Sequence, residues 1–202
     1  MRVIAEADEP FRTFYWIATE TGMRAGELCG LRTTDIYPEN CVIAVRQSAW
    51  RSVLQTPKTN NAVRWFPISP RLTAHLQSFL KSWRPNEKHL LFVNTIGGPL
   101  APCNIVRENL KPLLKKLNIE RPHRCGIHAF RHTSGTLLDR INAPLKIRQE
   151  RLGHALGSSI TVDLYTHTVP EDHRRVALQL GELLCPTVPT IQPFEQPQQS
   201  IQ

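Results

Sequence analysis

The alternating pattern that marks a β-strand is concentrated in one stretch of this chain, between residues 40 and 68. Three candidate strands lie there, with the sequences CVIAVRQ, SVLQT and VRWFPI. The Pro and Asn residues of TPKTNN, between the second and third of these, are typical of a hairpin turn. The pattern therefore predicts a single small antiparallel sheet in a fold that is otherwise helical.

Helical periodicity extends through most of the chain up to residue 184, so the predicted fold class is mainly α with a small antiparallel β-sheet (α+β). A further short strand is expected at 90–94, before a Gly-Gly-Pro loop. The sequence contains no internal repeat. Apolar residues at helical spacing predict helices at 10–21, 25–31, 72–80, 104–117, 128–141, 145–152, 158–164 and 171–184.

The composition changes at residue 185. The last segment, CPTVPTIQPFEQPQQSIQ, is rich in Pro and Gln, and Glu195 is its one charged residue. Such a segment cannot bury enough apolar surface to fold alone. We therefore expect residues 1–184 to form one domain and residues 185–202 to be a disordered tail.

Charge and cysteine usage indicate a class of partner and a compartment. The 25 Lys+Arg and 17 Asp+Glu residues give a formal net charge of +8, which fits a polyanion such as nucleic acid. The five cysteines are irregularly spaced and include no CxxC pair, as is typical of reduced thiols. The N-terminal residues lack the apolar core of a signal peptide, and the apolar runs are too short to span a bilayer. We expect a cytoplasmic protein that does not enter a membrane.

Cationic and imidazole side chains precede a tyrosine near the end of the chain, and together they suit attack on a phosphodiester by a phenol. His128 and Arg131 are three residues apart and share one face at the start of a predicted helix, where free N–H groups favour a phosphate. Arg24 can grip a phosphate with two parallel hydrogen bonds, and Glu27 can orient it. Taken singly, each of these residues is more often an ordinary surface residue. The full set is Arg24, Lys58, His128, Arg131, His154 and Tyr165.

The remaining three members contribute different chemistry. Lys58, in the predicted hairpin turn, is a mobile acid that can protonate a leaving oxygen. His154, in Leu-Gly-His, can donate a hydrogen bond to a phosphate oxygen, or can simply cap a helix. Tyr165 ends a short predicted helix, and its phenol, with an ordinary pKa of about 10, needs help to lose its proton.

A zinc site is the main competing interpretation of this region. Cys125, His128 and His132 have roughly the spacing of zinc ligands, and His123 lies nearby. A structural zinc site normally needs a fourth ligand and a CxxC pair, and neither is evident. The sequence also lacks a Walker loop, HExxH, GxSxG and an obvious carboxylate cluster for Mg²⁺. We therefore expect no metal.

Five motifs, in order, resemble the tyrosine recombinases, also called phage integrases. They extend over roughly residues 10–184, and each is weak alone, whereas five in order are specific. The resemblance implies the fold of a tyrosine recombinase catalytic domain. The motifs are TGMRAGELCGLRTTDI, TPKTNNAVRWFPI, IHAFRHTSGTLL, RLGHALGSSITVDLYTH and EDHRRVALQL.

The resemblance also implies a role for each residue. Arg24 and Arg131 would bind the scissile phosphate and stabilise its pentavalent transition state. His154 would add a third hydrogen bond, Lys58 would protonate the departing 5′ oxygen, and Glu27 would position the site from behind.

At the nucleophile, the resemblance implies that His128 assists proton transfer and that Tyr165 forms a 3′-phosphotyrosyl link. A 5′ hydroxyl from a partner strand would then rejoin the DNA. No metal and no ATP would be needed, because arginines neutralise the developing charge and one phosphoester replaces another. The implied partners are double-stranded DNA, further copies of the chain in a dimer or tetramer on DNA, and possible accessory proteins.

One departure from the family pattern keeps alternatives open. The family usually carries an N-terminal helical DNA-binding domain, whereas this chain begins almost at the catalytic domain, as an excised domain, a truncated gene or a minimal form would. The alternatives are a DNA-binding but inactive remnant, and a relaxing topoisomerase that also uses a 3′-phosphotyrosine. A topoisomerase acts as a monomer on one duplex, whereas a recombinase joins two sites.

Overall fold

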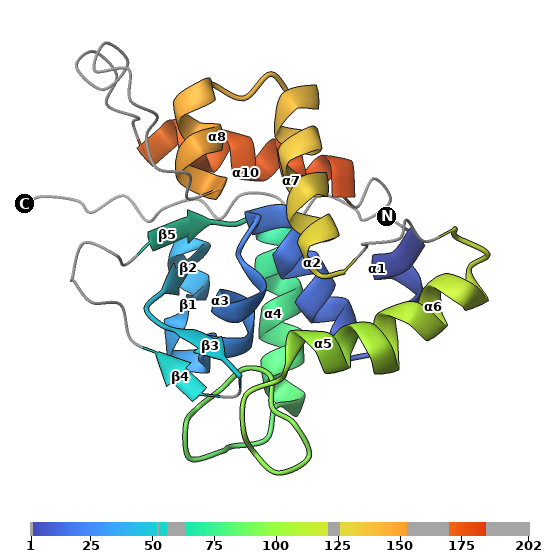
Figure 1. The fold of residues 1–202 in the computed structure, drawn as a ribbon. Helices are drawn as coiled ribbons and strands as arrows, with labels where there is room; N and C mark the ends of the chain where they lie inside the picture. Colours follow the sequence, from blue (N-terminus) through green and yellow to red (C-terminus); the bar gives the residue numbers. More distant parts are fainter. Residues whose placement is uncertain (1, 52, 56–63, 121–125, 153–169, 185–202) are drawn as a thin grey trace, which may run out of the picture.

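Helices predominate in the computed structural model, which describes residues 2–51, 53–55, 64–120, 126–152 and 170–184 (Figure 1). The predicted helix at 158–164 and the predicted tail at 185–202 lie outside the described residues. The α-helices are α1 (Arg2–Glu6), α2 (Phe11–Thr21), α3 (Ala25–Gly30), α4 (Pro70–Ser82), α5 (Pro102–Ile105), α6 (Lys111–Lys116), α7 (His128–Arg140), α8 (Leu145–Leu152) and α10 (Pro170–Leu184). The strands are β1 (Ile36–Tyr37), β2 (Val42–Val45), β3 (Ser48–Trp50), β4 (Val53–Gln55) and β5 (Arg64–Pro67).

The strands form two small antiparallel sheets, which confirms the predicted fold class. The predicted strands SVLQT and VRWFPI correspond to β4 and β5, whereas the strand predicted at 41–47 is too long and the predicted pairing of β4 with β5 is wrong. One sheet has the order β1-β2-β5, and the other pairs β3 with β4. In the described residues, β4 and β5, which flank Lys58, therefore belong to different sheets rather than to one hairpin.

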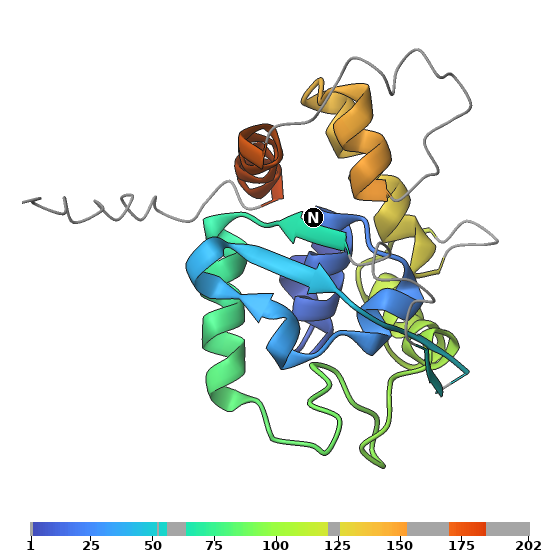
Figure 2. The same cartoon turned by 90° about the vertical axis from the view of Figure 1, so that its left-hand side faces the viewer.

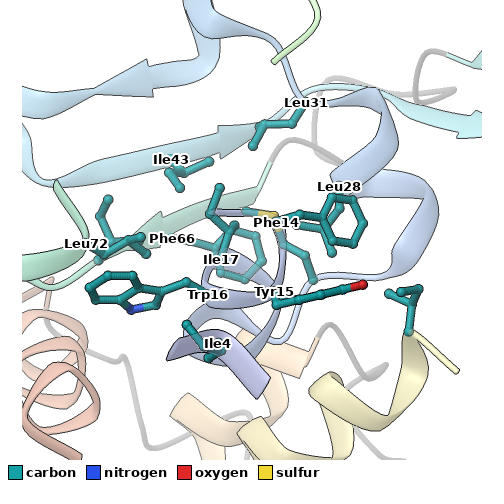
Figure 3. Close-up of a cluster of buried hydrophobic side chains, with 14 of the residues drawn as sticks. Ile4, Phe14, Tyr15, Trp16, Ile17, Leu28, Leu31, Ile43, Phe66 and Leu72 are labelled. Carbon is teal, nitrogen blue, oxygen red and sulfur yellow. The ribbon is translucent and has the colours of Figure 1, made fainter. Parts of the chain in front are cut away.

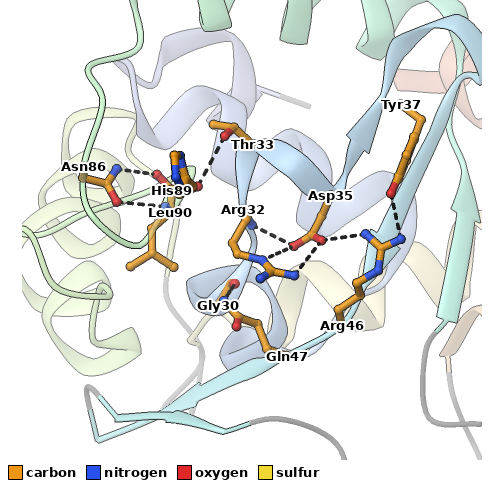
Figure 4. Close-up of polar contacts among 10 residues, drawn as sticks. All are labelled: Gly30, Arg32, Thr33, Asp35, Tyr37, Arg46, Gln47, Asn86, His89 and Leu90. Carbon is orange, nitrogen blue, oxygen red and sulfur yellow. Dashed lines mark hydrogen bonds and ion pairs between the residues drawn. The ribbon is translucent and has the colours of Figure 1, made fainter. Parts of the chain in front are cut away.

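The predicted strand at 41–47 ends at Val45, and its next two side chains bind Asp35, just before β1, and Gly30, at the end of α3. Arg46 Nη1 donates to the Asp35 carboxylate at 2.9 Å, and Gln47 Nε2 donates to the Gly30 carbonyl at 2.7 Å (Figure 4). The chain then runs along α3, close enough that a Cβ on Gly30 would lie 3.0 Å from the Ser48 backbone. Contacts with residues distant in sequence therefore determine where the strand ends.

The core is built around α2, whose residues from Thr13 to Thr21 are all buried. The sequence predicted an apolar stripe on one face of this helix, whereas in the structure neighbouring elements cover the helix on every side. Ile17 and Phe14 lie toward the β1-β2-β5 sheet with Ile43 and Phe66 in the same hydrophobic cluster (Figure 3). On another side, the ring of Tyr15 stacks on Phe130 of α7, with centroids 4.6 Å apart. The C-terminal end of α2, where the predicted Arg24 motif begins, is thus held from several directions.

Two other predicted elements differ in detail. The predicted helix at 104–117 is a continuous helical segment, but a π-helical turn (Val106–Leu110) separates α5 from α6. Pro112 is tolerated because it lies in the first turn of α6. The predicted strand at 90–94 is reduced to isolated bridges from Leu90 to Arg32 and from Val93 to Pro99.

The last helices, α7, α8 and α10, lie together above the sheet and α2 (Figures 1 and 2). α10 contacts α2, α4, α7 and β5. Gly181 allows this close packing, since a Cβ there would lie 2.4 Å from the Cβ of Ser69. No helix among the described residues is long and apolar enough to cross a membrane.

Candidate active site

Arg131 is the most firmly held of the predicted site residues. It lies one turn into α7, and the residue is only 6% exposed. Its Nη1 donates to the Gly22 carbonyl at 2.6 Å, and its Nη2 donates to the Leu152 carbonyl. The guanidinium is therefore fixed by main-chain groups from the end of α2 and the end of α8.

Gly22 makes this arrangement possible. It ends α2 in the left-handed conformation, with φ of +70°, which glycine adopts without a steric penalty. A Cβ at this position would lie 2.9 Å from Leu152 Cδ2 and 3.1 Å from Ser134 Oγ. Its carbonyl can therefore approach Arg131 only because the side chain is absent.

Arg24 and Glu27 form the capping box of α3, and the predicted contact between Glu27 and the Arg24 guanidinium is present. The Glu27 carboxylate accepts a hydrogen bond from the Arg24 backbone N–H at 2.8 Å and from Arg24 Nη1 at 3.3 Å. The Arg24 side chain is still 52% exposed, whereas the Glu27 side chain is 12% exposed. Glu27 thus holds Arg24 from behind, and the cationic end remains accessible to an anion.

The structure adds Arg64, which sequence reasoning missed. Its Nη2 donates to the same Glu27 oxygen that pairs with Arg24, and its guanidinium lies 5.0 Å from the centroid of the Phe66 ring. One carboxylate therefore joins two arginines at the edge of the site. The alternation along β5 could have found Arg64. Trp65 is exposed and Phe66 is buried, so Arg64, two residues from Phe66, lies on the inward face of the strand.

A pocket of about 650 Å³ joins the predicted residues that the structure describes. Arg24 reaches it from the start of α3, and His128 and Arg131 reach it from one face of α7, as their spacing predicted. The wall thus carries two arginines and two histidines, a donor set suited to a phosphate. The lining residues are Arg24, His128, Arg131, His132, Gly135, Thr136, Asp139 and Leu152.

His128 has the electrostatic surroundings of a proton carrier. Partial burial lowers its pKa from the ordinary value of 6.5, and the nearby His132, Arg131 and Arg24 lower it further. The His128 and His132 rings meet edge to face, with centroids 4.5 Å apart. The lowered pKa favours the neutral imidazole of His128, which is the form that can accept a proton.

This arrangement predicts the titration of His128 in the DNA-free protein. We expect its ring signals in NMR to titrate with a midpoint below pH 6.5, because the ring is partly buried and protonation adds a positive charge beside other cationic groups. Replacing His132 by asparagine removes the nearest of these groups and should raise the midpoint. Arg140→Gln, at the far end of α7, is the matched control and should leave it in place. A midpoint that does not move in His132→Asn would contradict this electrostatic account.

Three of the predicted residues, Lys58, His154 and Tyr165, lie outside the described residues. Two zinc candidates, His123 and Cys125, also lie outside them. Within the described ranges, no group of three or more His, Cys, Asp or Glu side chains is arranged to hold a metal ion. The described part of the site is therefore the pair of arginines, His128 and the Glu27 that orients Arg24.

Comparison with known proteins identifies the family. The model of the Phage integrase family matches residues 2–172. The chain belongs to the phage integrase family. The tyrosine recombinase XerC-like protein of Caldanaerobacter subterraneus subsp. tengcongensis is 29% identical over 197 residues, which cover 85% of this chain and 49% of that protein. The ICEBs1 integrase of Bacillus subtilis is 29% identical over 189 residues, covering 86% and 49%.

Solved structures give the same family assignment. The Tn1549 transposon integrase, determined in complex with circular intermediate DNA, matches this phage integrase family member with a TM-score of 0.66 and 26% identity. The match covers 86% of this chain and 62% of that one. The fold is therefore that of a tyrosine recombinase catalytic domain, and the chain spans about half the length of the curated relatives it matches.

Proposed function

We propose that this chain is the catalytic part of a site-specific DNA recombinase or integrase. It would bind double-stranded DNA in the cytoplasm and cleave and rejoin strands through a 3′-phosphotyrosyl intermediate. The observation that carries the proposal is the convergence of Arg24, His128 and Arg131 on one pocket. Family membership and the DNA-bound Tn1549 integrase support it.

The proposed first step forms one phosphoester and breaks another. The oxygen of Tyr165 attacks the scissile phosphorus, and the neutral imidazole of His128 takes up the phenolic proton. The 5′ oxygen of the DNA leaves with a proton from Lys58. The negative charge that builds on the phosphate oxygens is stabilised by Arg24 and Arg131.

The remaining groups support this step, and a second step reverses it. His154 donates a further hydrogen bond to the phosphate, and Glu27 keeps Arg24 in its extended position through the observed contacts. A 5′ hydroxyl from a partner strand then attacks the phosphotyrosine and restores a phosphodiester. These groups supply the charge stabilisation, so the proposal needs no metal, and because one phosphoester replaces another at each step it needs no ATP. Exchange between two duplexes requires further copies of the chain on DNA, and accessory proteins could direct it.

A trapping assay on a pool of DNA sequences tests the proposal. Nicked duplexes with a randomised core lose a short fragment after cleavage, so that a covalent adduct accumulates. We expect a denaturation-resistant adduct at the 3′ end, with a free 5′ hydroxyl, and no adduct with the matched control Tyr165→Phe. An adduct that persists in Tyr165→Phe would exclude Tyr165 as the nucleophile.

Two other outcomes separate the alternatives. DNA binding without an adduct, both in this chain and in a fusion with a family-type N-terminal DNA-binding domain, would indicate an inactive remnant. An adduct accompanied by relaxation of supercoiled plasmid, with no joining of two duplexes, would indicate a topoisomerase-like enzyme.

A further inference from the structure

Two buried charged residues, Glu20 of α2 and Arg151 of α8, have no role in the proposed chemistry. Glu20 is 0% exposed and Arg151 is 2% exposed. Burying charges is unfavourable unless they are paired and hydrogen-bonded, and a hydrophobic pair of similar volume is often at least as stable. Their presence at the centre of the molecule therefore calls for an explanation other than stability.

Glu20 fixes the end of α2 against the start of α4. One carboxylate oxygen accepts a hydrogen bond from the Ser69 backbone N–H at 2.5 Å. The other accepts hydrogen bonds from Ser69 Oγ and Trp16 Nε1, both at 3.1 Å. Ser69 in turn caps α4 by accepting the Leu72 N–H at 3.2 Å. The carboxylate is thus held by three donors, two of them from the residue that caps α4.

Arg151 fixes the end of α8 against the same place. Its Nη2 donates to the Pro67 carbonyl at 2.7 Å, at the end of β5, and its Nη1 lies 3.5 Å from the Glu20 backbone carbonyl. Burial lowers the pKa of Arg151 to about 10, and the nearby charge of Glu20 offsets only part of this effect. Because the guanidinium is rigid and planar, its two contacts determine both the distance and the orientation of α8 relative to α2 and β5.

These two residues adjoin the groups that hold the catalytic arginine. Arg151 immediately precedes Leu152, and Glu20 lies two residues before Gly22. The carbonyls of Leu152 and Gly22 are the two acceptors of the Arg131 guanidinium. The Leu152 side chain also reaches Gly22, where a Cβ would lie 2.9 Å from its Cδ2. Any shift between the ends of α2 and α8 would therefore separate the two acceptors of Arg131.

We infer that Glu20 and Arg151 are positioning residues, which lock the ends of α2 and α8 together so that the Gly22 and Leu152 carbonyls fix the Arg131 guanidinium. Neither residue touches the pocket, and each acts through the main chain. The expected effect of these residues on DNA cleavage rests on the proposed function, whereas their expected effect on the orientation of Arg131 does not. This difference allows the two to be tested separately.

The test uses a double variant, Glu20→Gln with Arg151→Met, which removes both buried ionisable side chains at once. The matched control is Asp35→Asn. Asp35 is 1% exposed and binds Arg32 Nε at 3.1 Å and Arg46 Nη1 at 2.9 Å, in a network that does not contact Arg131 (Figure 4). Thermal unfolding of both variants is measured first, and the later measurements are made where each is fully folded.

The first readout is the Arg131 side chain in the DNA-free protein. In the wild type, two carbonyl acceptors restrict rotation of the guanidinium, and separate Nη–H signals are expected by ¹⁵N NMR. The double variant should merge these signals, and Asp35→Asn should not. Separate Nη–H signals that persist in the double variant would overturn the inference, whether or not the chain cleaves DNA.

The second readout is the rate of covalent adduct formation at saturating nicked DNA. Displacing a charge-stabilising group by about 1 Å lowers a rate by roughly 100-fold, so the double variant should lose about that factor while its affinity for DNA changes little. Equal losses in the double variant and in Asp35→Asn would show a merely structural role. An absence of adduct in the wild type would defeat the proposed function, and the NMR result would still decide the inference.

Discussion

Replacing Arg131 by lysine is expected to slow strand cleavage by about 10³-fold, because removal of one preorganised donor from a developing oxyanion has an effect of that order. The Arg131 guanidinium has five N–H donors, and the Gly22 and Leu152 carbonyls occupy two of them. A lysine ammonium cannot bind both carbonyls and present a planar pair of donors to a phosphate. The measurement is the rate of adduct formation on the nicked substrate.

The matched control for Arg131→Lys lies on the same helix. Arg140→Lys makes the same chemical change at an exposed position at the end of α7, away from the pocket lining, and should leave the cleavage rate nearly unchanged. Affinity for DNA should fall much less than the rate, because the lost interaction is made mainly in the transition state. A rate in Arg131→Lys within tenfold of wild type would exclude this role for Arg131.

Gly22→Ala should lower the free energy of unfolding by about 2–5 kcal/mol, the sum of two effects. A left-handed conformation costs a residue with a Cβ about 1–2 kcal/mol, and an extra methyl group in a packed site costs about 1–3 kcal/mol. The added Cβ would lie 2.9 Å from Leu152 Cδ2 and 3.1 Å from Ser134 Oγ, so neighbouring atoms must move. Urea unfolding measures the change.

Gly97→Ala separates the two effects. Gly97 also has a positive φ, of +76°, but no atom lies within 4 Å of the position of its Cβ. This variant should therefore show the conformational effect alone. The additional loss in Gly22→Ala should be accompanied by slower cleavage, since the Gly22 carbonyl binds Arg131. Equal losses of stability in the two variants would show that the Leu152 and Ser134 contacts are unimportant.

Local spacing predicted the parts of the site that depend on one helix turn. Arg24 with Glu27, and His128 with Arg131, are pairs three residues apart, and helix geometry alone places each pair together. The predicted helices at 10–21, 128–141 and 145–152 correspond closely to α2, α7 and α8. The order of the family motifs along the chain then predicted the tyrosine recombinase fold, which composition alone could not predict.

The rest of the arrangement depends on contacts between residues far apart in sequence. In the sequence Arg64 is a single charged residue within a predicted strand. Its contact with Glu27, 37 residues away, arises only when the chain folds. No local motif singles out Glu20 or Arg151, and both are buried because α2 and α8 meet at the end of β5. The strand predicted at 41–47 was too long for the same reason, since Gln47 binds Gly30 of α3.

The burial of α2 limits where new chain termini can be introduced by circular permutation. A helix that is covered on every side, as α2 is from Thr13 to Thr21, joins the sheet to α7 and α10 in one cooperative unit. New termini placed in or beside α2 would expose that surface. Ile96 is 89% exposed and Gly97 has open space around it, so a circular permutation opened there would leave α2 and its neighbours intact.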